Sequence, residues 1–225
     1  MKKLTVQTIS GFLKLFAALV LFIFLPAGTL RYWQGWIFLF VFLGCAAAIT
    51  LYFLKHDPKL IESRLQAGPV AEKQREQKII QALAGFFFAS ILVISGLDRR
   101  FGWSDLSGWA DLLGDGFVLL GYGVIFWVFR ENTYAASVVT IRSKQKVIST
   151  GPYGYVRHPM YAGSFVMLLG IPLALGSLWG IAPASLLCAI VVVRLIEEEK
   201  FLSKKLPGYK AYCRKTPYRL IRGLW

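Results

Sequence analysis

Long apolar runs separated by basic segments are the dominant pattern of this 225-residue chain. The hydrocarbon core of a bilayer takes roughly 20 apolar residues per helix, so runs of that length with almost no charge predict membrane-spanning helices. Four such runs lie at about residues 10–27, 33–54, 79–97 and 109–129.

A fifth apolar stretch, Ala162–Val193, holds 32 residues without one charge and is too long for a single span. Its middle, Gly176–Gly180, is typical of a tight turn, so the stretch predicts a helical hairpin. We therefore expect an all-α, polytopic integral membrane protein with about six transmembrane helices. Residues 1–225 would form a single membrane domain.

Composition supports a membrane protein and argues against other classes. The chain is 56% hydrophobic and only 17% charged, with a mean hydropathy of +0.55, which excludes a disordered chain. Its three cysteines form no C-x-x-C pair and its two histidines lie in different polar segments. We expect neither a disulfide scaffold nor a metal site.

The basic residues predict the orientation. With the N-terminus in the cytoplasm, 23 of the 26 Lys and Arg fall on the cytoplasmic side, and the others are Arg31, Arg99 and Arg100. The positive-inside rule then predicts that both termini are cytoplasmic. The protein would lie in the inner or plasma membrane. Topology and an anionic leaflet explain the net charge of +14 without nucleic-acid binding.

Two features of the fourth run have a structural interpretation. Gly114–Gly116 and Gly121–Gly123 do not fit a dinucleotide-binding loop, and their use in close helix packing is expected. Asp111 and Asp115 share a helix face near the outer end, where they would pair with Arg99 or Arg100.

The stretch Thr150–Gly163 is the first candidate for chemistry. Pro159 opens an apolar helix with His158 near its cap, so unpaired backbone N–H groups would lie beside Arg157 and suit a carboxylate or phosphate. The alternative is that Arg157 anchors the membrane flank and the tyrosines form an interfacial belt. Those tyrosines are Tyr153, Tyr155 and Tyr161.

The acidic end of the hairpin, Arg194–Leu202, is the second candidate. The stretch from Ile181 to Val193 has only 13 residues, too few to cross roughly 30 Å of hydrocarbon, so either the helix tilts little and the bilayer thins or Arg194 and some glutamates lie inside the protein at membrane depth. The alternative is an Arg194–Glu198 pair on a solvated helix end. The hairpin returns this segment to the face where Arg157 lies.

Two cytoplasmic segments would cover this face. Val138–Ile141 and Lys146–Ser149 resemble two short strands of a flap. The basic, tyrosine-containing tail after Lys200 suits an interfacial segment that closes the other side.

Together, Arg157-His158-Pro159-Met160-Tyr161-Ala162-Gly163 and the later glutamates follow the pattern R-H-P-x-Y-x-G, then E-E. This pattern resembles the isoprenylcysteine carboxyl methyltransferase and phospholipid methyltransferase superfamily. The likeness covers roughly residues 131–225, which would form the methyltransferase-like part. Residues 1–78 form a two-helix part without a recognised motif.

The resemblance implies an S-adenosylmethionine-dependent methyltransferase whose lipophilic acceptor, a carboxylate or a lipid amine, enters from the bilayer at the cytoplasmic face. It implies catalytic roles for Arg157 and Glu198. Glu197 makes the acidic pair a triplet, so which two glutamates bind the cofactor stays open. The implied cofactor-binding residues are Tyr153, His158, Pro159, Tyr161, Gly163, Glu198 and Glu199.

Two other functions remain open. NADPH-dependent membrane sterol or enone reductases have a similar motif, but tend to carry Asn after the proline and an acid after the glycine. This chain has Met160 and Ser164 there. A non-enzymatic membrane scaffold or transporter would leave the motif unexplained.

Overall fold

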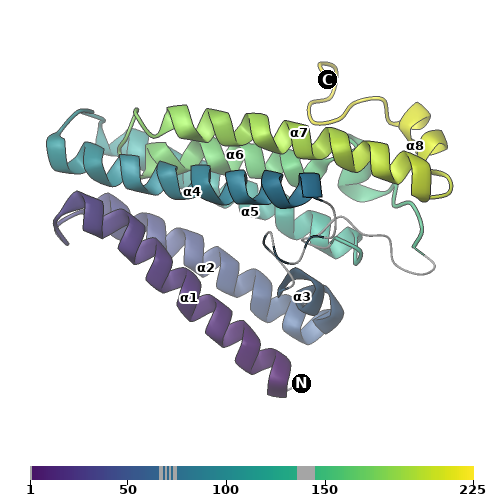
Figure 1. Ribbon diagram of the computed structural model, residues 1–225, viewed down its shortest axis with the longest axis horizontal. Coiled ribbons are helices and arrows are strands. Elements are labelled where there is room, and N and C mark those ends of the chain that lie inside the picture. The colour runs from purple at the N-terminus through teal and green to yellow at the C-terminus, as the bar shows by residue number, and fades with distance from the viewer. Residues whose placement is uncertain (1, 66–67, 69, 71, 73–74, 136–144) are drawn as a thin grey trace.

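The computed structural model describes residues 2–65, 68, 70, 72, 75–135 and 145–225 (Figure 1). Within these ranges the chain forms eight α-helices, one short 3-10 helix and no strand, which confirms the all-α prediction. The elements are α1 Lys2–Ala27, α2 Trp33–His56, α3 Pro58–Leu65, α4 Arg75–Phe101, α5 Gly108–Glu131, η1 Gly151–Gly154, α6 Pro159–Ala174, α7 Ile181–Lys205 and α8 Tyr209–Lys215.

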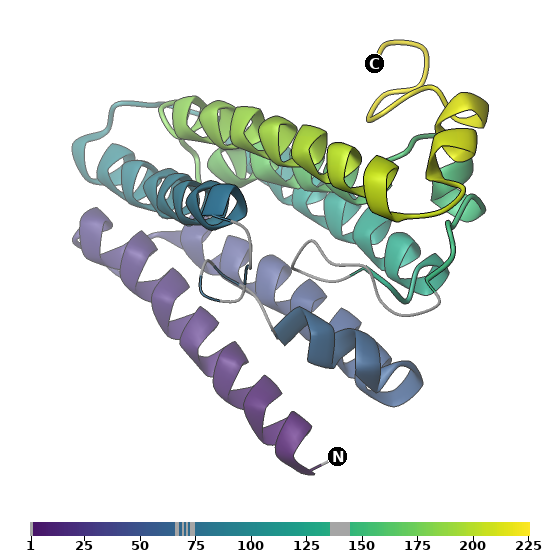
Figure 2. The same cartoon turned by 45° about the vertical axis from the view of Figure 1, so that its right-hand side comes forward.

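Four helices, α1, α2, α4 and α5, are long and apolar enough to cross a membrane. They match the four predicted runs and confirm a polytopic membrane protein. Figures 1 and 2 show α4 to α7 grouped side by side, with α1 and α2 as a second layer that diverges from them toward the N-terminus.

The predicted hairpin is confirmed. The helices α6 and α7 run antiparallel and are joined by residues 175–180, where Gly176 adopts a φ of 65° that favours glycine. The Ser177 N–H donates to the Pro172 carbonyl (2.8 Å), which closes the turn. The sixteen residues of α6 span only about 24 Å, and the count of six membrane crossings stays a prediction.

The second half of α7 contains the acidic segment. The helix continues past Val193 without a break to Lys205, and its 25 residues span about 37 Å. Arg194 and the three glutamates are therefore ordinary helical positions.

Glycines hold α5 against α6, the most extensive helix pair. A Cβ on Gly114 would lie 2.1 Å from the Ala174 nitrogen, and a Cβ on Gly121 would lie 2.6 Å from the Gly163 carbonyl oxygen. Packing by these two glycines is confirmed. Gly116 and Gly123 face open space instead.

The far end of the bundle contains the α6–α7 turn and a buried polar cluster. Asp98 accepts hydrogen bonds from the Ser104 hydroxyl (2.7 Å) and the Ser177 hydroxyl (2.5 Å). Asp111 accepts one from the Gln34 amide (3.2 Å), and the described residues show no ion pair from it to Arg99 or Arg100. Asp115 forms no such ion pair among the described residues either, so the predicted pairing was wrong, and Asp111 binds a neutral donor on α2 instead.

The opposite end, where α6 begins and α7 ends, brings α3, η1 and α8 together (Figure 1). The chain enters α1 and leaves α7 at this same end. The first strand of the predicted flap, Val138–Ile141, lies outside the described residues. Its second, Lys146–Ser149, is not a strand.

Candidate active site

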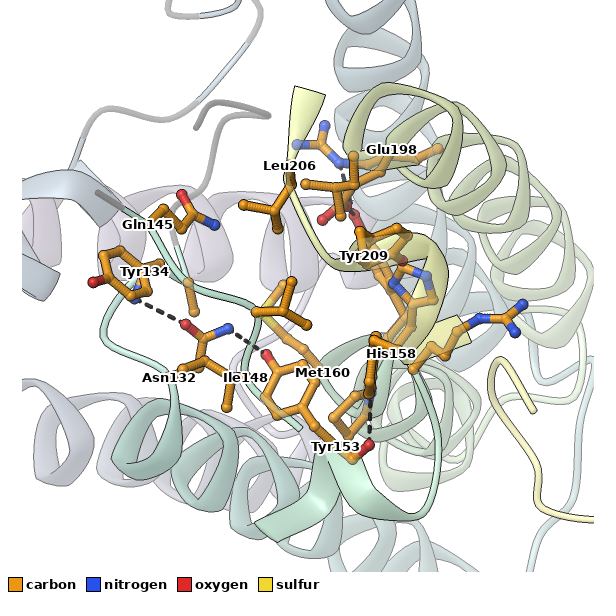
Figure 3. Close-up of a pocket in the computed structure, with 18 of the residues that line it drawn as sticks. Asn132, Tyr134, Gln145, Ile148, Tyr153, His158, Met160, Glu198, Leu206 and Tyr209 are labelled. Carbon is orange, nitrogen blue, oxygen red and sulfur yellow. Dashed lines mark hydrogen bonds between the residues drawn. The ribbon is translucent and has the colours of Figure 1, made fainter. Parts of the chain in front are cut away.

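A cavity of about 360 Å³ lies at the end where α6 begins and α7 ends. Figure 3 shows Tyr153 and Met160 on one side of it, Glu198, Leu206 and Tyr209 on another, and the side chains of Tyr134 and Gln145 on a third. The polar residues that line it are Arg64, Gln81, Asn132, Tyr134, Gln145, Lys146, Tyr153, Arg157, His158, Tyr161, Ser164, Arg194, Glu198, Tyr209 and Tyr212.

The tail of the chain fixes the start of α6. The Arg157 N–H donates to the Tyr218 carbonyl and the His158 N–H to the Arg219 carbonyl, both at 2.9 Å. Pro159 occupies the first turn of α6, as predicted. Two backbone segments about sixty residues apart therefore lie side by side at the mouth of the cavity.

Glu199 lies behind the cavity wall and binds three basic side chains. Its carboxylate pairs with Arg157 Nε (2.6 Å), Arg219 Nε (2.8 Å) and His158 Nε2 (3.2 Å). Burial alone would raise the pKa of Glu199, but hydrogen bonds from His158, Arg219 and Arg157 outweigh it and lower the pKa to about 2. The carboxylate is therefore charged, and it couples the tail to the R-H-P motif.

Arg157 makes further bonds to the tail. Its Nη1 donates to the Pro217 carbonyl (2.8 Å) and the Thr216 carbonyl (3.3 Å). The side chain is almost fully buried yet still lines the cavity. Arg157 thus both holds the tail and presents positive charge to the cavity.

Glu198 is the one carboxylate among the described residues that line the cavity. It accepts a hydrogen bond from the Tyr161 hydroxyl (2.6 Å), and that hydroxyl accepts one from Arg194 Nε (3.2 Å). Arg194 Nη2 also pairs with Glu72 (3.0 Å). The Glu198 carboxylate is thus held in place by neighbours on α6 and α7.

Glu197 points elsewhere. It pairs with Lys200 at 2.7 Å, and the side chains are 38% exposed for Glu197 and 62% exposed for Lys200. The three consecutive glutamates therefore have three environments: Glu197 lies at the surface, Glu198 in the cavity wall and Glu199 in the network behind it. Of the three glutamates, only Glu197 fits the alternative interpretation of this segment as a solvated helix end.

Tyrosines form the remaining polar wall. The Asn132 amide donates to the Tyr153 hydroxyl (2.7 Å), and the Tyr212 hydroxyl donates to the Tyr153 carbonyl (2.8 Å). Burial, opposed by the Asn132 bond and reinforced by Glu198, raises the pKa of Tyr153 to about 12, so the phenol stays protonated. Tyr209 is 4% exposed, and its hydroxyl has no hydrogen-bond partner in the part of the chain that the structure describes.

The structure brings most of the predicted residues to one place. Gly163 lies instead on the α5-facing side of α6, where a Cβ would meet Val124 at 2.9 Å. Of the three tyrosines in the alternative belt, only Tyr155 is exposed. The predicted residues that line the cavity are Tyr153, Arg157, His158, Pro159, Tyr161 and Glu198.

Several cavity residues were not among those predicted. Arg64 comes from α3 and Gln81 from α4, both earlier in the chain than the part that carries the motif. Glu72 reaches the site through Arg194. No spacing or composition marks these residues, because their neighbours in space lie far away along the chain.

These helices and this cavity define a polytopic membrane protein with a ligand-sized site at one end of a helical hairpin. Comparison with known families adds a match to part of the chain. The model of the phospholipid methyltransferase family matches residues 109–207, which include α5, the R-H-P motif and the three glutamates. This match over 44% of the chain confirms the resemblance that the sequence pattern indicated.

Three curated proteins are similar over shorter stretches. The nickel-cobalt-cadmium resistance protein NccN of Alcaligenes xylosoxydans xylosoxydans is 31% identical over 85 residues, 37% of this chain and 40% of that protein. The cobalt-zinc-cadmium resistance protein CzcN of Cupriavidus metallidurans is 29% identical over 85 residues, 37% of this chain and 39% of that protein. The Delta(14)-sterol reductase TM7SF2 of Mus musculus is 32% identical over 102 residues, 41% of this chain and 24% of that protein.

The matches thus span two fifths or less of each relative.

The part of this chain that the structure describes contains no group of three or more His, Cys, Asp or Glu arranged to hold a metal ion.

Proposed function

We propose that the protein is an S-adenosylmethionine-dependent methyltransferase that acts on a lipophilic acceptor, a carboxylate or a lipid amine, at the cytoplasmic face of the membrane. One observation carries the proposal. The family-matched segment contributes Arg157, His158, Tyr161 and Glu198 to a single cavity.

The cavity fits such a cofactor in size and chemistry. Its volume of about 360 Å³ lies within the usual range of roughly 300–1,000 Å³ for small-molecule sites. Glu198 suits the positive charges of the ligand, and the faces of Tyr153 and Tyr212 suit them as well. The buried Tyr209 hydroxyl, which lacks a partner among the described residues, would gain one from a polar ligand.

The chain's contribution to catalysis would be positioning and exclusion of water. The bound cofactor supplies an electrophilic methyl group: the acceptor's lone pair forms the new bond to carbon while the sulfur–carbon electrons stay with sulfur. Glu198 would hold positive charge, and Arg157 with the α6 N-terminus would hold a carboxylate. The tail and α8 would keep water out, so that alignment provides most of the rate enhancement.

The lining also offers a route for a lipophilic acceptor. Gln81 and Ala84 belong to α4 and Ile125 belongs to α5, two helices that are long and apolar enough to cross a membrane. An acceptor dissolved in the bilayer would reach the cavity between them. A carboxylate acceptor needs no base, whereas an amine must first lose a proton.

Binding experiments on detergent-solubilised protein test this proposal. We expect S-adenosylhomocysteine to bind in isothermal titration and NADPH not to bind. Substituting His158→Ala or Tyr161→Phe should weaken binding while the helical content stays close to that of the wild type. Both variants unfolding with unchanged affinity in the folded fraction would contradict this role.

The sterol reductase match makes an NADPH-dependent sterol or enone reductase the second candidate. Basic residues in the cavity would suit phosphates. However, Arg157 pairs with Glu199 and Arg194 pairs with Glu72, and both glutamates lie outside the cavity lining. Binding of NADPH but not of S-adenosylhomocysteine would favour the reductase, and binding of neither would argue against both.

The orientation is part of the same proposal. The basic residues favour cytoplasmic termini, and α1 begins at the end of the bundle where α7 ends. Alkaline phosphatase fused after Trp225 should therefore be inactive in cells, because that enzyme works only when exported. Activity of this fusion would overturn the orientation.

A further inference from the structure

Arg194 and Glu198 lie one turn apart on α7, where opposite charges ordinarily pair. Among the described residues, no ion pair joins them. Arg194 Nη2 pairs instead with Glu72 at 3.0 Å, and its Nε donates to the Tyr161 hydroxyl at 3.2 Å. The guanidinium thus reaches the neighbouring carboxylate only through the Tyr161 hydroxyl, without a direct ion pair among the described residues.

Glu72 is well placed to hold this arrangement. It is 4% exposed and precedes α4, outside the family-matched residues 109–207. Gln81 Nε2 donates to the same Oε1 atom at 2.9 Å, and the Gly68 N–H donates to Gln81 Oε1 at 3.1 Å. A buried carboxylate is costly unless it is paired and hydrogen-bonded, and Glu72 has both kinds of partner.

The consequence reaches the cavity through Tyr161. Because its hydroxyl oxygen accepts from Arg194, its proton is directed to Glu198 at 2.6 Å. Glu198 therefore receives a neutral hydrogen-bond donor rather than a cation. Glu198 has no direct ion pair among the described residues, and it is the one carboxylate among those that line the cavity.

We propose that Glu72 is a positioning residue for the cavity: by pairing with Arg194 it keeps that guanidinium off Glu198, so that the Glu198 charge is available to a cationic ligand. This inference rests on the proposed function, since the cationic ligand is S-adenosylmethionine. Without the Glu72 charge, Arg194 would turn to Glu198 and form the pair expected one helical turn apart.

Titration of S-adenosylmethionine into the purified full chain tests this role. Glu72→Gln should weaken binding about tenfold, as expected when one charged interaction is lost. Adding Arg194→Gln, which removes the competing cation but keeps a donor for Tyr161, should restore affinity to within about threefold of the wild type. Glu76→Gln, an exposed glutamate four residues further on, should bind as the wild type does.

Rescue separates positioning from a structural role. A damaged fold would not recover when a second buried residue is replaced, so a double variant that binds as weakly as Glu72→Gln overturns the proposal. Unchanged affinity of Glu72→Gln also overturns it. If that variant does not fold, Glu72→Asp is measured with the same second substitution, and the same criteria apply. A wild type that binds no S-adenosylmethionine refutes the proposed function, and this inference with it.

Discussion

The bundle has a buried polar cluster at each end, and the two are built differently. In the turn cluster, Asp98 accepts from serine hydroxyls and Asp111 Oδ2 accepts from an amide, while Asp111 Oδ1 has no partner among the described residues. The cavity cluster, around Glu198 and Glu199, combines carboxylates with arginines and a histidine. Neutral hydrogen-bond donors are enough to stabilise a turn, whereas charged side chains around a cavity can bind a ligand electrostatically.

Burial alone does not distinguish the two clusters. Asp98 is 1% exposed and Arg157 is 9% exposed, so both would be classed as core positions. The difference is that cavity residues keep atoms facing an open volume, while the oxygens of Asp98 are occupied by donors from the α4–α5 loop and the α6–α7 turn. We therefore expect substitutions at one end to change binding and at the other to change stability.

The largest expected effect is at Glu198. Replacing Glu198 with Gln removes the charge and should weaken S-adenosylmethionine binding roughly tenfold to a hundredfold, because hydrogen bonds to charged groups contribute about 1.5 to 3 kcal/mol. Thermal stability in detergent should change little. The matched control is Glu197→Gln, which alters an exposed pair with Lys200 and should bind normally. Equal losses in both variants, measured by isothermal titration, would contradict the different roles.

At the turn cluster the expected effect is on stability. Asp98→Ala leaves the Ser104 N–H, the Ser104 hydroxyl and the Ser177 hydroxyl without their acceptor, which should cost about 1 to 3 kcal/mol of unfolding free energy. The exposed Asp105 of the same loop provides a control, since Asp105→Ala should leave the melting temperature unchanged. S-adenosylhomocysteine affinity of the folded Asp98 variant should match the wild type. Weaker binding there would mean that the two ends are coupled.

A smaller effect should appear with pH. Hydrogen bonds outweigh burial and lower the pKa of Glu199 from 4.5 to about 2, so its stabilising contribution is fully present above pH 4.5 and is lost as the pH falls toward 2. The melting-temperature advantage of the wild type over Glu199→Gln should therefore be constant from about pH 7 to about pH 5 and shrink below that range. An advantage that stays the same down to about pH 3 would show that the Glu199 charge does not hold the tail.

Local patterns determined the helices and the motif. Apolar runs predicted α1, α2, α4 and α5, and the glycines of residues 176–180 predicted the hairpin turn. The R-H-P motif and the three glutamates could be found from the sequence because each consists of neighbouring residues in the chain. The chain could not indicate which glutamate enters the cavity, since three consecutive residues on a helix point in directions about 100° apart and only the packing of α7 selects one.

Tertiary structure decided the partners. Arg194 had a local partner in Glu198, yet it pairs with Glu72, 122 positions earlier, because packing of α4 against α7 brings that carboxylate close. Tertiary packing likewise brings the backbone carbonyls of Tyr218 and Arg219 in the tail to the N–H groups of Arg157 and His158. Apolar runs and the basic residues that flank them can be recognised one segment at a time. The sequence by itself therefore determined the helices and favoured an orientation. Contacts between distant segments depend on the packing of the whole chain, and only the structure shows them.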